Sequence, residues 1–329
     1  MRRRECLSFL GTLIFSRPTI ASSQSRVMAW RVGIVTAYYP DDAEIQSRLD
    51  GFTRELRSLD AKNKTITNIS LRSASGSSDL VKIYARETVE QRPDAILSAT
   101  TSVTSAILKE TKDIPIVFVS VSDPVGSGFV NNVSKPEKNV TGFVNTDPTL
   151  CVKWVEILKE VAPGISYIAI MYNPLTAPYS NFYIDPFVST AHAFNLQPLV
   201  VPVSTEEDIA AAVSAVAQKG GGLILMNDSF VTNKRFLINN LIRHHKVPTM
   251  AYNRHITASG GLISYGVDEV DTYSRAAHYI YRILQGEKIA ELPVQRPERI
   301  NLAINMETAR LLGLSFPESI FAQANEVFE

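Results

Sequence analysis

The chain has few cysteines, no excess of charge and no apolar run long enough to span a membrane. Its two cysteines are Cys6, in an N-terminal segment that we expect to be removed, and Cys151. Cys151 is then alone, which excludes an internal disulfide, and a lone cysteine is most often a small buried hydrophobe. The 33 basic and 33 acidic residues cancel, whereas nucleic-acid binding favours a clustered basic face. No apolar run approaches about 18 residues, so we expect no transmembrane helix.

Enzyme signatures are absent too. The chain contains no Gly-x-Ser-x-Gly nucleophile elbow and no Gly-x4-Gly-Lys-Ser/Thr phosphate loop. Gly126-Ser-Gly128 lacks the third glycine and the following helix of a dinucleotide site. We therefore expect no catalytic residue and no cofactor. The histidines show no four-residue helical spacing typical of a metal site, so we expect no metal and assign them surface or capping roles: His192, His244, His245, His255 and His278.

The first 23 residues have the layout of an export signal. A basic start at Arg2 to Arg4 precedes a short apolar segment, Leu7 to Phe15, and small residues follow at 19–23. The apolar segment is too short for a stable membrane anchor, so we interpret residues 1–23 as a signal peptide. The paired arginines resemble a twin-arginine signal. The alternative is a basic start that is never removed.

The sequence does contain an alternation of strand-like and helix-like segments, and the same alternation occurs in both halves of the chain. A length of 329 residues suggests about two domains. Strand-like Arg31 to Thr36 precedes helix-like Ala43 to Leu59, whose apolar residues recur at spacings of three and four. The same alternation starts again at Tyr167 to Tyr172. Alternating strands and helices predict an α/β fold of two doubly wound, mostly parallel lobes.

The two lobes are expected to exchange segments. A long tail follows Gly266, and a tail after two finished lobes is expected to cross back between them. The predicted N-terminal lobe comprises residues 30–144 plus 266–296, and the C-terminal lobe comprises residues 145–265 plus 297–329. The three connections are expected to be hinges, at about 143–146, 264–267 and 293–299.

Polar and aromatic residues follow the predicted strands. In parallel α/β sheets ligands bind beyond the carboxyl ends of the strands, so these residues are candidates for a ligand site. The helix that opens at residues 100–102 offers free backbone N–H groups to an anion. Asp123 or Asp228 could receive an ammonium group, and the tyrosines could stack on a flat ligand. The alternative is that these residues only cap helices and make turns. The candidates are Thr36, Tyr38, Thr100, Thr101, Ser102, Ser122, Asp123, Asn173, Asn227, Asp228, Tyr252 and Tyr265.

Four segments carry a resemblance to a known family. They are Ile114 to Gly126, Asn139 to Gly142, Gly260 to Gly266 and the ending Asn305 to Leu314. With them, residues 31–329 resemble the substrate-binding proteins of ABC transporters with the type I periplasmic-binding-protein fold, the group that includes tryptophan/tyrosine-type uptake components. The resemblance implies a monomeric periplasmic receptor. It would close on a small-molecule ligand and deliver it to a membrane permease, with the ATPase subunit on another chain.

Other functions stay open at this point. A periplasmic sensor that signals to a membrane protein would have the same sequence features. An intracellular regulator is disfavoured because an export signal, not a helix-turn-helix, precedes Arg31. A hydrolase using Ser122 and Asp123 is the enzyme alternative. The polar strand ends and tyrosines suit an amino acid, including an aromatic one, but also a sugar or a nucleoside.

Overall fold

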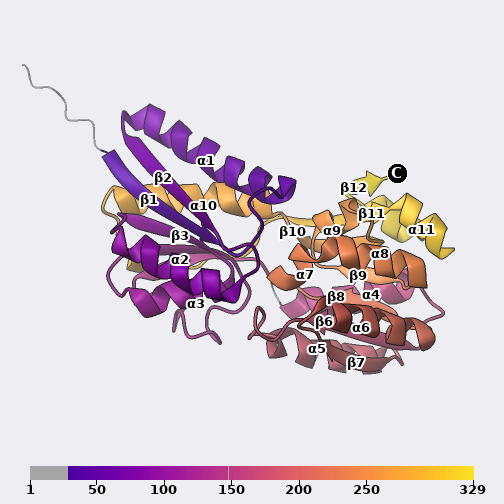
Figure 1. Cartoon of the computed structure of the whole chain (residues 1–329). Coiled ribbons are helices and arrows are strands. Elements are labelled where there is room, and N and C mark those ends of the chain that lie inside the picture. Colours follow the sequence, from indigo (N-terminus) through magenta and orange to yellow (C-terminus); the bar gives the residue numbers. More distant parts are fainter. Residues whose placement is uncertain (1–28, 147) are drawn as a thin grey trace, which may run out of the picture.

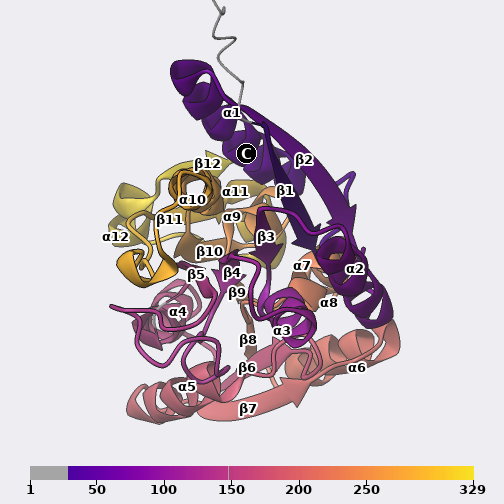
Figure 2. The same ribbon diagram turned by 90° about the vertical axis from the view of Figure 1, so that its left-hand side faces the viewer.

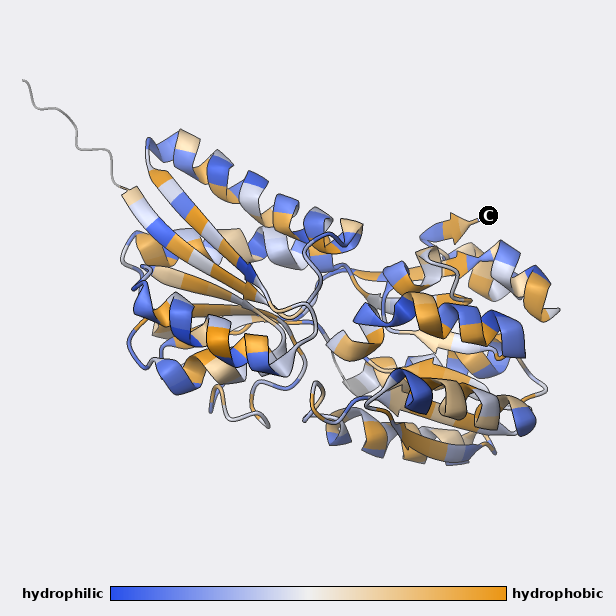
Figure 3. Ribbon diagram, viewed as in Figure 1, coloured by the Kyte–Doolittle hydropathy of each residue, from blue (hydrophilic) through white to orange (hydrophobic). Residues whose placement is uncertain are grey.

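The computed structural model describes residues 29–146 and 148–329, which form two α/β lobes side by side (Figure 1). The predicted signal peptide lies outside the described residues. In these two ranges, no helix combines the length and the apolar character needed to cross a membrane. Each lobe is built on its own sheet, and apolar residues concentrate in the strands of both sheets (Figure 3).

The N-terminal lobe has a five-stranded parallel sheet in the order β2-β1-β3-β4-β5. Every residue of β3, β4 and β5 is buried, as expected for strands covered on both faces. Helices α1 and α10 pack together on one face, and α2 and α3 pack together on the other (Figure 2). The elements are β1 Ala29–Thr36, α1 Ala43–Asn63, β2 Ile66–Ser73, α2 Ser78–Glu90, β3 Ala95–Ala99, α3 Thr101–Glu110, β4 Ile116–Val121, β5 Val140–Val144 and α10 Glu269–Leu284.

The C-terminal lobe has a seven-stranded sheet in the order β12-β11-β10-β9-β8-β6-β7. Its strands are parallel except for the antiparallel pair β10–β11. The two mostly parallel sheets predicted from the sequence are therefore confirmed. The strands are β6 Tyr167–Tyr172, β7 Gln197–Pro202, β8 Gly222–Leu225, β9 Thr249–Ala251, β10 Ile263–Val267, β11 Ile300–Asn305 and β12 Glu326–Phe328.

The segments after β8 and β9 form separate helices. Two helices, α7 and α8, follow β8, and the short helix α9 follows β9. The buried Cys151 in α4 confirms its expected place in the core. The helices are α4 Pro148–Val161, α5 Asn181–Ala193, α6 Glu206–Gln218, α7 Ser229–Asn233, α8 Arg235–His245, α9 Arg254–Ala258, α11 Met306–Leu312 and α12 Glu318–Gln323, and a 3₁₀ turn, η1, spans Ile289–Glu291.

The chain passes between the two sheets three times. It leaves the first sheet after Val144, returns between Val267 and Glu269, and crosses again between Gln295 and Ile300. Gln295 is tied to the first sheet by a parallel bridge to Phe143. This exchange places α10 against α1, although more than two hundred residues separate them along the chain (Figure 1).

An irregularity in β4 shapes the middle of the molecule. The register between β4 and β5 shifts between Phe118 and Val121, and Ser120 there has a φ of 53°. Opposite, a Cβ on Gly142 would lie 2.1 Å from the carbonyl oxygen of Phe118, so only glycine fits. A bulge of this kind re-aims a side chain. Here the Ser120 hydroxyl donates to Glu269 Oε2 at 2.8 Å.

Candidate functional site: a cleft between the two lobes

Two adjoining cavities lie between the lobes. The first, of about 380 Å³, is lined by α3 and the loop after β4 from one lobe and by residues 178–182 from the other. The second, of about 480 Å³, is lined by the loop before α2 and by residues of α2 and α3, and from the other lobe by the loop after β6 and the start of α7. Ser105 and Pro178 line both cavities. Volumes of this size suit small-molecule ligands, and the walls come from the carboxyl ends of strands in both lobes.

The N-terminus of α3 brings a strained backbone and an unpaired hydroxyl to the first cavity. Thr100 caps the helix with φ 98° and ψ 155°, a conformation that is otherwise almost restricted to glycine. Such strain persists only where the surroundings impose it, and it gathers at functional sites. The next residue, Thr101, lines the first cavity, is 3% exposed, and its hydroxyl has no hydrogen-bond partner within the described residues.

Asp123 lines the same cavity, and its carboxylate has few hydrogen-bond partners among the described residues. Its Oδ1 accepts the backbone N–H of Gly126 at 2.8 Å, which closes the turn after β4. The side chain is half-buried, and the ion pairs found among the described residues do not include it. An anion-binding helix terminus and an available carboxylate therefore face one cavity. Such a pair of groups can bind both ends of a zwitterion.

The other predicted carboxylate, Asp228, is turned into its own lobe. It caps α7 and accepts the backbone N–H groups of Asn173 at 2.7 Å and Phe230 at 2.9 Å. The hydroxyl of Thr176 also donates to it. Burial raises the pKa of Asp228 to about 6, against the opposing effect of these donors. Asp228 and Asn173 thus fix the loops whose neighbouring residues line the second cavity.

Aromatic rings form the far wall of the first cavity. Tyr179 and Phe182 line it from the C-terminal lobe, and Phe129 lines it from the other side. Behind them the buried ring of Tyr183 stacks on Trp154, with ring centroids 5.6 Å apart and planes 14° apart. Because Tyr183 also contacts the rings of Tyr179 and Phe182, this wall is held as one packed unit.

Two further predicted residues meet across the lobes. Ser122 directly follows β4, and its Oγ accepts a hydrogen bond from the hydroxyl of Tyr183 at 3.1 Å. Asn227 Nδ2 donates to Tyr183 Oη at 3.2 Å, and Asn145 Nδ2 donates to Asn227 Oδ1 at 3.3 Å. All four side chains are buried. Ser122 and Asn227 therefore contact the opposite lobe and line neither of the two cavities.

The rest of the predicted set is dispersed. Ser102 lines the second cavity, whereas Thr36 and Tyr38 are buried inside the N-terminal lobe. Burial raises the pKa of Tyr38 to about 12. The hydroxyl of Tyr252 is hydrogen-bonded to Thr232 inside the C-terminal lobe. Tyr265 pairs within the sheet and lines neither cavity. No cluster of His, Cys, Asp and Glu in 29–146 and 148–329 could hold a metal ion.

Comparison with known proteins decides the family. Residues 35–328 match the family model described as ABC transporter substrate binding protein. The chain belongs to the ABC transporter substrate-binding protein family. A relative in Clostridioides difficile (strain R20291), called tyrosine-binding protein, is 25% identical over 267 residues, which are 80% of this chain and 76% of the relative. Proteins of this family bind ligands and are not enzymes.

Solved structures share the fold of this substrate-binding protein. One is an ABC domain in complex with L-Trp from Streptococcus pneumonia, with a TM-score of 0.84, 22% identity, and coverage of 91% of this chain and 100% of that chain. Another is a ligand-free, open substrate binding protein with adhesive properties from Clostridium difficile, with a TM-score of 0.66, 22% identity, and coverage of 91% and 99%. The fold is that of the type I periplasmic binding proteins.

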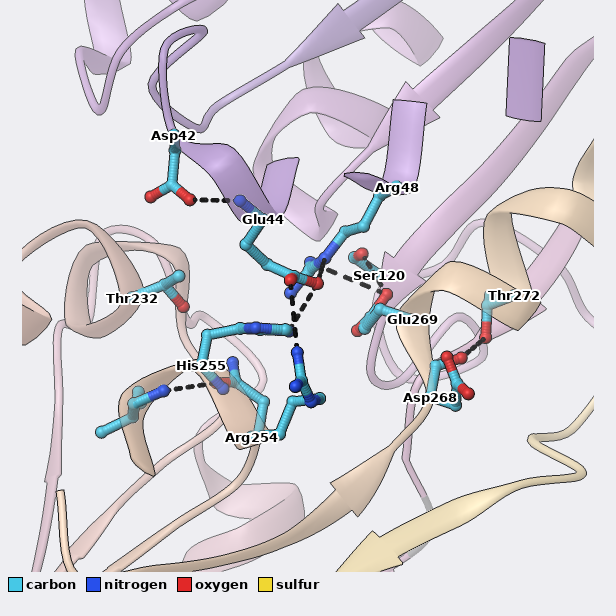
Figure 4. Close-up of polar contacts among 12 residues, drawn as sticks. Asp42, Glu44, Arg48, Ser120, Thr232, Arg254, His255, Asp268, Glu269 and Thr272 are labelled. Atoms are coloured by element: carbon cyan, nitrogen blue, oxygen red, sulfur yellow. Dashed lines mark hydrogen bonds and ion pairs between the residues drawn. The ribbon is translucent and has the colours of Figure 1, made fainter. Parts of the chain in front are cut away.

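A second polar cluster in this substrate-binding protein was missed by sequence reasoning. Arg48 is 1% exposed in α1, and its Nε lies 3.2 Å from Glu44 Oε1 (Figure 4). Glu44 in turn lies 2.5 Å from Nε2 of the buried His255 in the other lobe. The expected surface or capping role is therefore wrong for His255. A signal existed, because Arg48 stands on the apolar stripe of its helix, three residues after Ile45.

Proposed function

We propose that this protein is the periplasmic binding component of an ABC uptake system and binds an aromatic amino acid between its lobes. One observation carries the proposal. The buried, unpartnered hydroxyl of Thr101 and the available carboxylate of Asp123 face one cavity that is walled by aromatic rings. A buried polar group without a partner is costly, so a ligand group that pairs with it gains that energy on binding.

The ligand carboxylate is assigned to the N-terminus of α3. The first backbone N–H groups of a helix have no partner within the helix, and the helix dipole favours an anion there. The Thr101 hydroxyl supplies an additional donor at the same place. The capping bond that the Val103 N–H donates to Thr100 Oγ1 is long, at 3.4 Å, so it competes weakly with a ligand.

The ligand ammonium group is assigned to Asp123 and not to Asp228. Both carboxylates follow buried strands, but the oxygens of Asp228 already accept two backbone N–H groups and a hydroxyl. Within the described residues, the Asp123 carboxylate accepts only the Gly126 N–H, and it lines the cavity. An ammonium group would complete its hydrogen bonding with a charge-assisted bond.

An aromatic side chain suits the remaining wall. Tyr179, Phe182 and Phe129 line the first cavity, and aromatic pairs gain energy beyond the area that they bury. The names of the relatives point the same way, since one is called tyrosine-binding protein and another was solved with L-Trp. This supports tyrosine or tryptophan over a sugar or a nucleoside.

Uptake requires the two lobes to open, close and release. We assign residues 30–144 with 266–296 to one moving body and residues 145–265 with 297–329 to the other, with hinges at the three crossings. Contacts of the ligand to both lobes offset the cost of closing. The closed monomer then delivers its ligand to a membrane permease, which a separate ATPase subunit drives. Export through the predicted signal peptide, by the twin-arginine route, places the protein in the periplasm.

Calorimetric titration of the purified protein tests the ligand class. L-Tyrosine or L-tryptophan is expected to bind, whereas tyramine, which lacks the carboxylate, and 3-(4-hydroxyphenyl)propionate, which lacks the ammonium group, are expected to bind at least about tenfold more weakly. Small-angle scattering with saturating ligand is expected to show a smaller radius of gyration. If none of the aromatic amino acids binds while a sugar or nucleoside does, the proposed ligand is wrong.

A further inference from the structure

A charged contact joins the lobes away from both cavities. Asp42 and Glu44 extend from the start of α1 in one lobe. Arg254 and His255, at the start of α9, extend from the other (Figure 4), and Arg235, at the start of α8, belongs to the same lobe. The two cavities are not lined by any of these five residues. This set is called the charged contact below.

Two pairs in the charged contact are short and shielded from water. Asp42 Oδ2 lies 2.6 Å from Arg235 Nη1, with side chains 7% and 9% exposed. Glu44 Oε1 lies 2.5 Å from His255 Nε2, with side chains 13% and 8% exposed. Glu44 Oε2 lies 3.8 Å from Arg254 Nη1. Shielded pairs are screened by salt much less than surface pairs are.

Each half of the charged contact is held in position by its own lobe. Arg48 fixes Glu44, and Arg48 in turn faces the buried Glu269, with 3.9 Å between Nη1 and Oε2. In the other lobe, both carboxylate oxygens of Glu326, in the C-terminal strand β12, accept bonds from Arg254. The Arg254 guanidinium also lies 5.7 Å from the ring centre of Phe328. These supports pre-orient the groups that meet across the lobes.

We infer that Asp42 and Glu44 are positioning residues for ligand binding, which hold the lobes closed without touching the ligand. This inference rests on the proposed function, since it concerns closing around a ligand. When the lobes separate, these groups part from their partners and are hydrated; when the lobes close, they pair. The fraction of closed protein scales the apparent affinity for any ligand that both lobes contact.

Two charge-removing variants test the inference. Glu44→Gln keeps the side-chain shape, and Asp42→Asn keeps an N-cap that still accepts the Glu44 N–H. Each variant is expected to raise the Kd for L-tyrosine about tenfold, chiefly through a faster dissociation rate. The matched control is Glu55→Gln, also in α1, which removes a Glu–His pair that lies within one lobe. Its partner, His278, belongs to the same lobe at 3.0 Å, so its Kd is expected to be unchanged.

A double-variant cycle separates a contact between lobes from general damage. If Asp42 and Arg235 act as a pair, Asp42→Asn combined with Arg235→Gln raises the Kd less than the product of the two single effects. Fully multiplicative effects would overturn the pairing. Wild-type Kd and dissociation rate in both Glu44→Gln and Asp42→Asn would overturn the positioning role.

A ligand-free measurement keeps this inference distinct from the proposed ligand. Spin labels at Lys62→Cys and Glu207→Cys, both exposed and in different lobes, report the inter-lobe distance, while the native Cys151 is buried. Adding Glu44→Gln is expected to shift the distance distribution to longer values, and Glu55→Gln is not. Identical distributions in all three proteins would overturn the charged contact as a closing device. Failure of aromatic amino acids to bind would overturn only the proposed function.

Discussion

The carboxylate of Asp123 lies directly against the Cα of Gly126. The Gly126 N–H donates to Asp123 Oδ1 at 2.8 Å, and a Cβ built on Gly126 would come within 1.9 Å of Oδ2. No side chain fits there unless the carboxylate moves. Gly126 therefore determines the position of the Asp123 carboxylate in the first cavity.

Gly126→Ala should consequently weaken ligand binding without harming the fold. Gly126 is exposed and its φ lies outside the left-handed region, so alanine meets no backbone strain. The displaced Asp123 should raise the Kd for L-tyrosine about tenfold in calorimetry. Gly164→Ala is the control, since a Cβ there meets nothing within 4 Å. Equal affinity in both variants would show that the Asp123 carboxylate position does not matter.

Thr101→Val should stabilise the protein and weaken ligand binding. The Thr101 hydroxyl is buried without a partner, so replacing it by a methyl group removes a desolvation cost of about 1 kcal/mol from the native state. The same change removes a donor from the proposed carboxylate site. Urea unfolding and calorimetry measure the two effects separately.

Thr104→Val on the same helix is the contrasting control for Thr101→Val. Its hydroxyl donates to Thr100 O at 2.9 Å and contacts Ser98 Oγ at 2.8 Å. Valine there should lower the free energy of unfolding by about 1–3 kcal/mol, because buried partners lose their bond. If Thr101→Val lowers the free energy of unfolding as much as Thr104→Val does, the Thr101 hydroxyl forms a hydrogen bond within the protein and is not free to bind a ligand.

The sequence predicts the strands that position this site better than it predicts which side chains face the cavities. Buried β-branched runs such as Ile116 to Val121 identify parallel strands, and residues after strand ends must gather at one edge of a sheet. Which of them faces a cavity depends on contacts that are distant in the chain. Asp123 and Asp228 both follow buried strands, yet the N–H of Asn173, 55 residues away, binds Asp228 inside its lobe.

Other misses have equally physical causes. The strand β12 has three residues, Glu326 to Phe328, and gains its order by pairing with β11, so no local periodicity indicates it. His255 contacts Glu44 of the other lobe, a partner more than two hundred residues away that no local pattern indicates. Arg48 was detectable, because a charged residue on an apolar helical stripe must find a buried partner.

Asp228→Asn should act through stability more than through ligand contact. An asparagine keeps one carbonyl oxygen where the carboxylate accepts from Asn173, Phe230 and Thr176. We expect the free energy of unfolding to fall by about 1–3 kcal/mol. Asp123→Asn should instead leave urea unfolding unchanged and remove the preference for L-tyrosine over its analogue without the ammonium group. The reverse pattern in the two variants would exchange the roles assigned to these residues.

Acid should destabilise the native protein through His255. Burial lowers the pKa of His255 from 6.5 to about 4, so the folded protein keeps this ring neutral while the unfolded chain takes up a proton. The unfolded state binds more protons in this range, so stability falls as pH drops from 6.5 towards 4, by up to about 3 kcal/mol. Asp228 acts oppositely, because burial raises its pKa from 3.8 to about 6 and the native state then holds the proton.

Comparison of the wild type with His255→Gln isolates the histidine contribution from that of Asp228. Glutamine can still donate to Glu44 but does not titrate, so the variant should lose less stability than the wild type between pH 6.5 and 4. Glu44 adds a further loss at the acid end. Burial alone would raise the pKa of Glu44, but a hydrogen bond from His255 and the charge of Arg48 outweigh it and lower that pKa below 4.5. The contribution of Glu44 to stability therefore disappears only when the pH falls through that lowered value. Urea unfolding at half-unit pH steps measures the difference. Parallel stability profiles for the two proteins would mean that His255 is not buried in its neutral form.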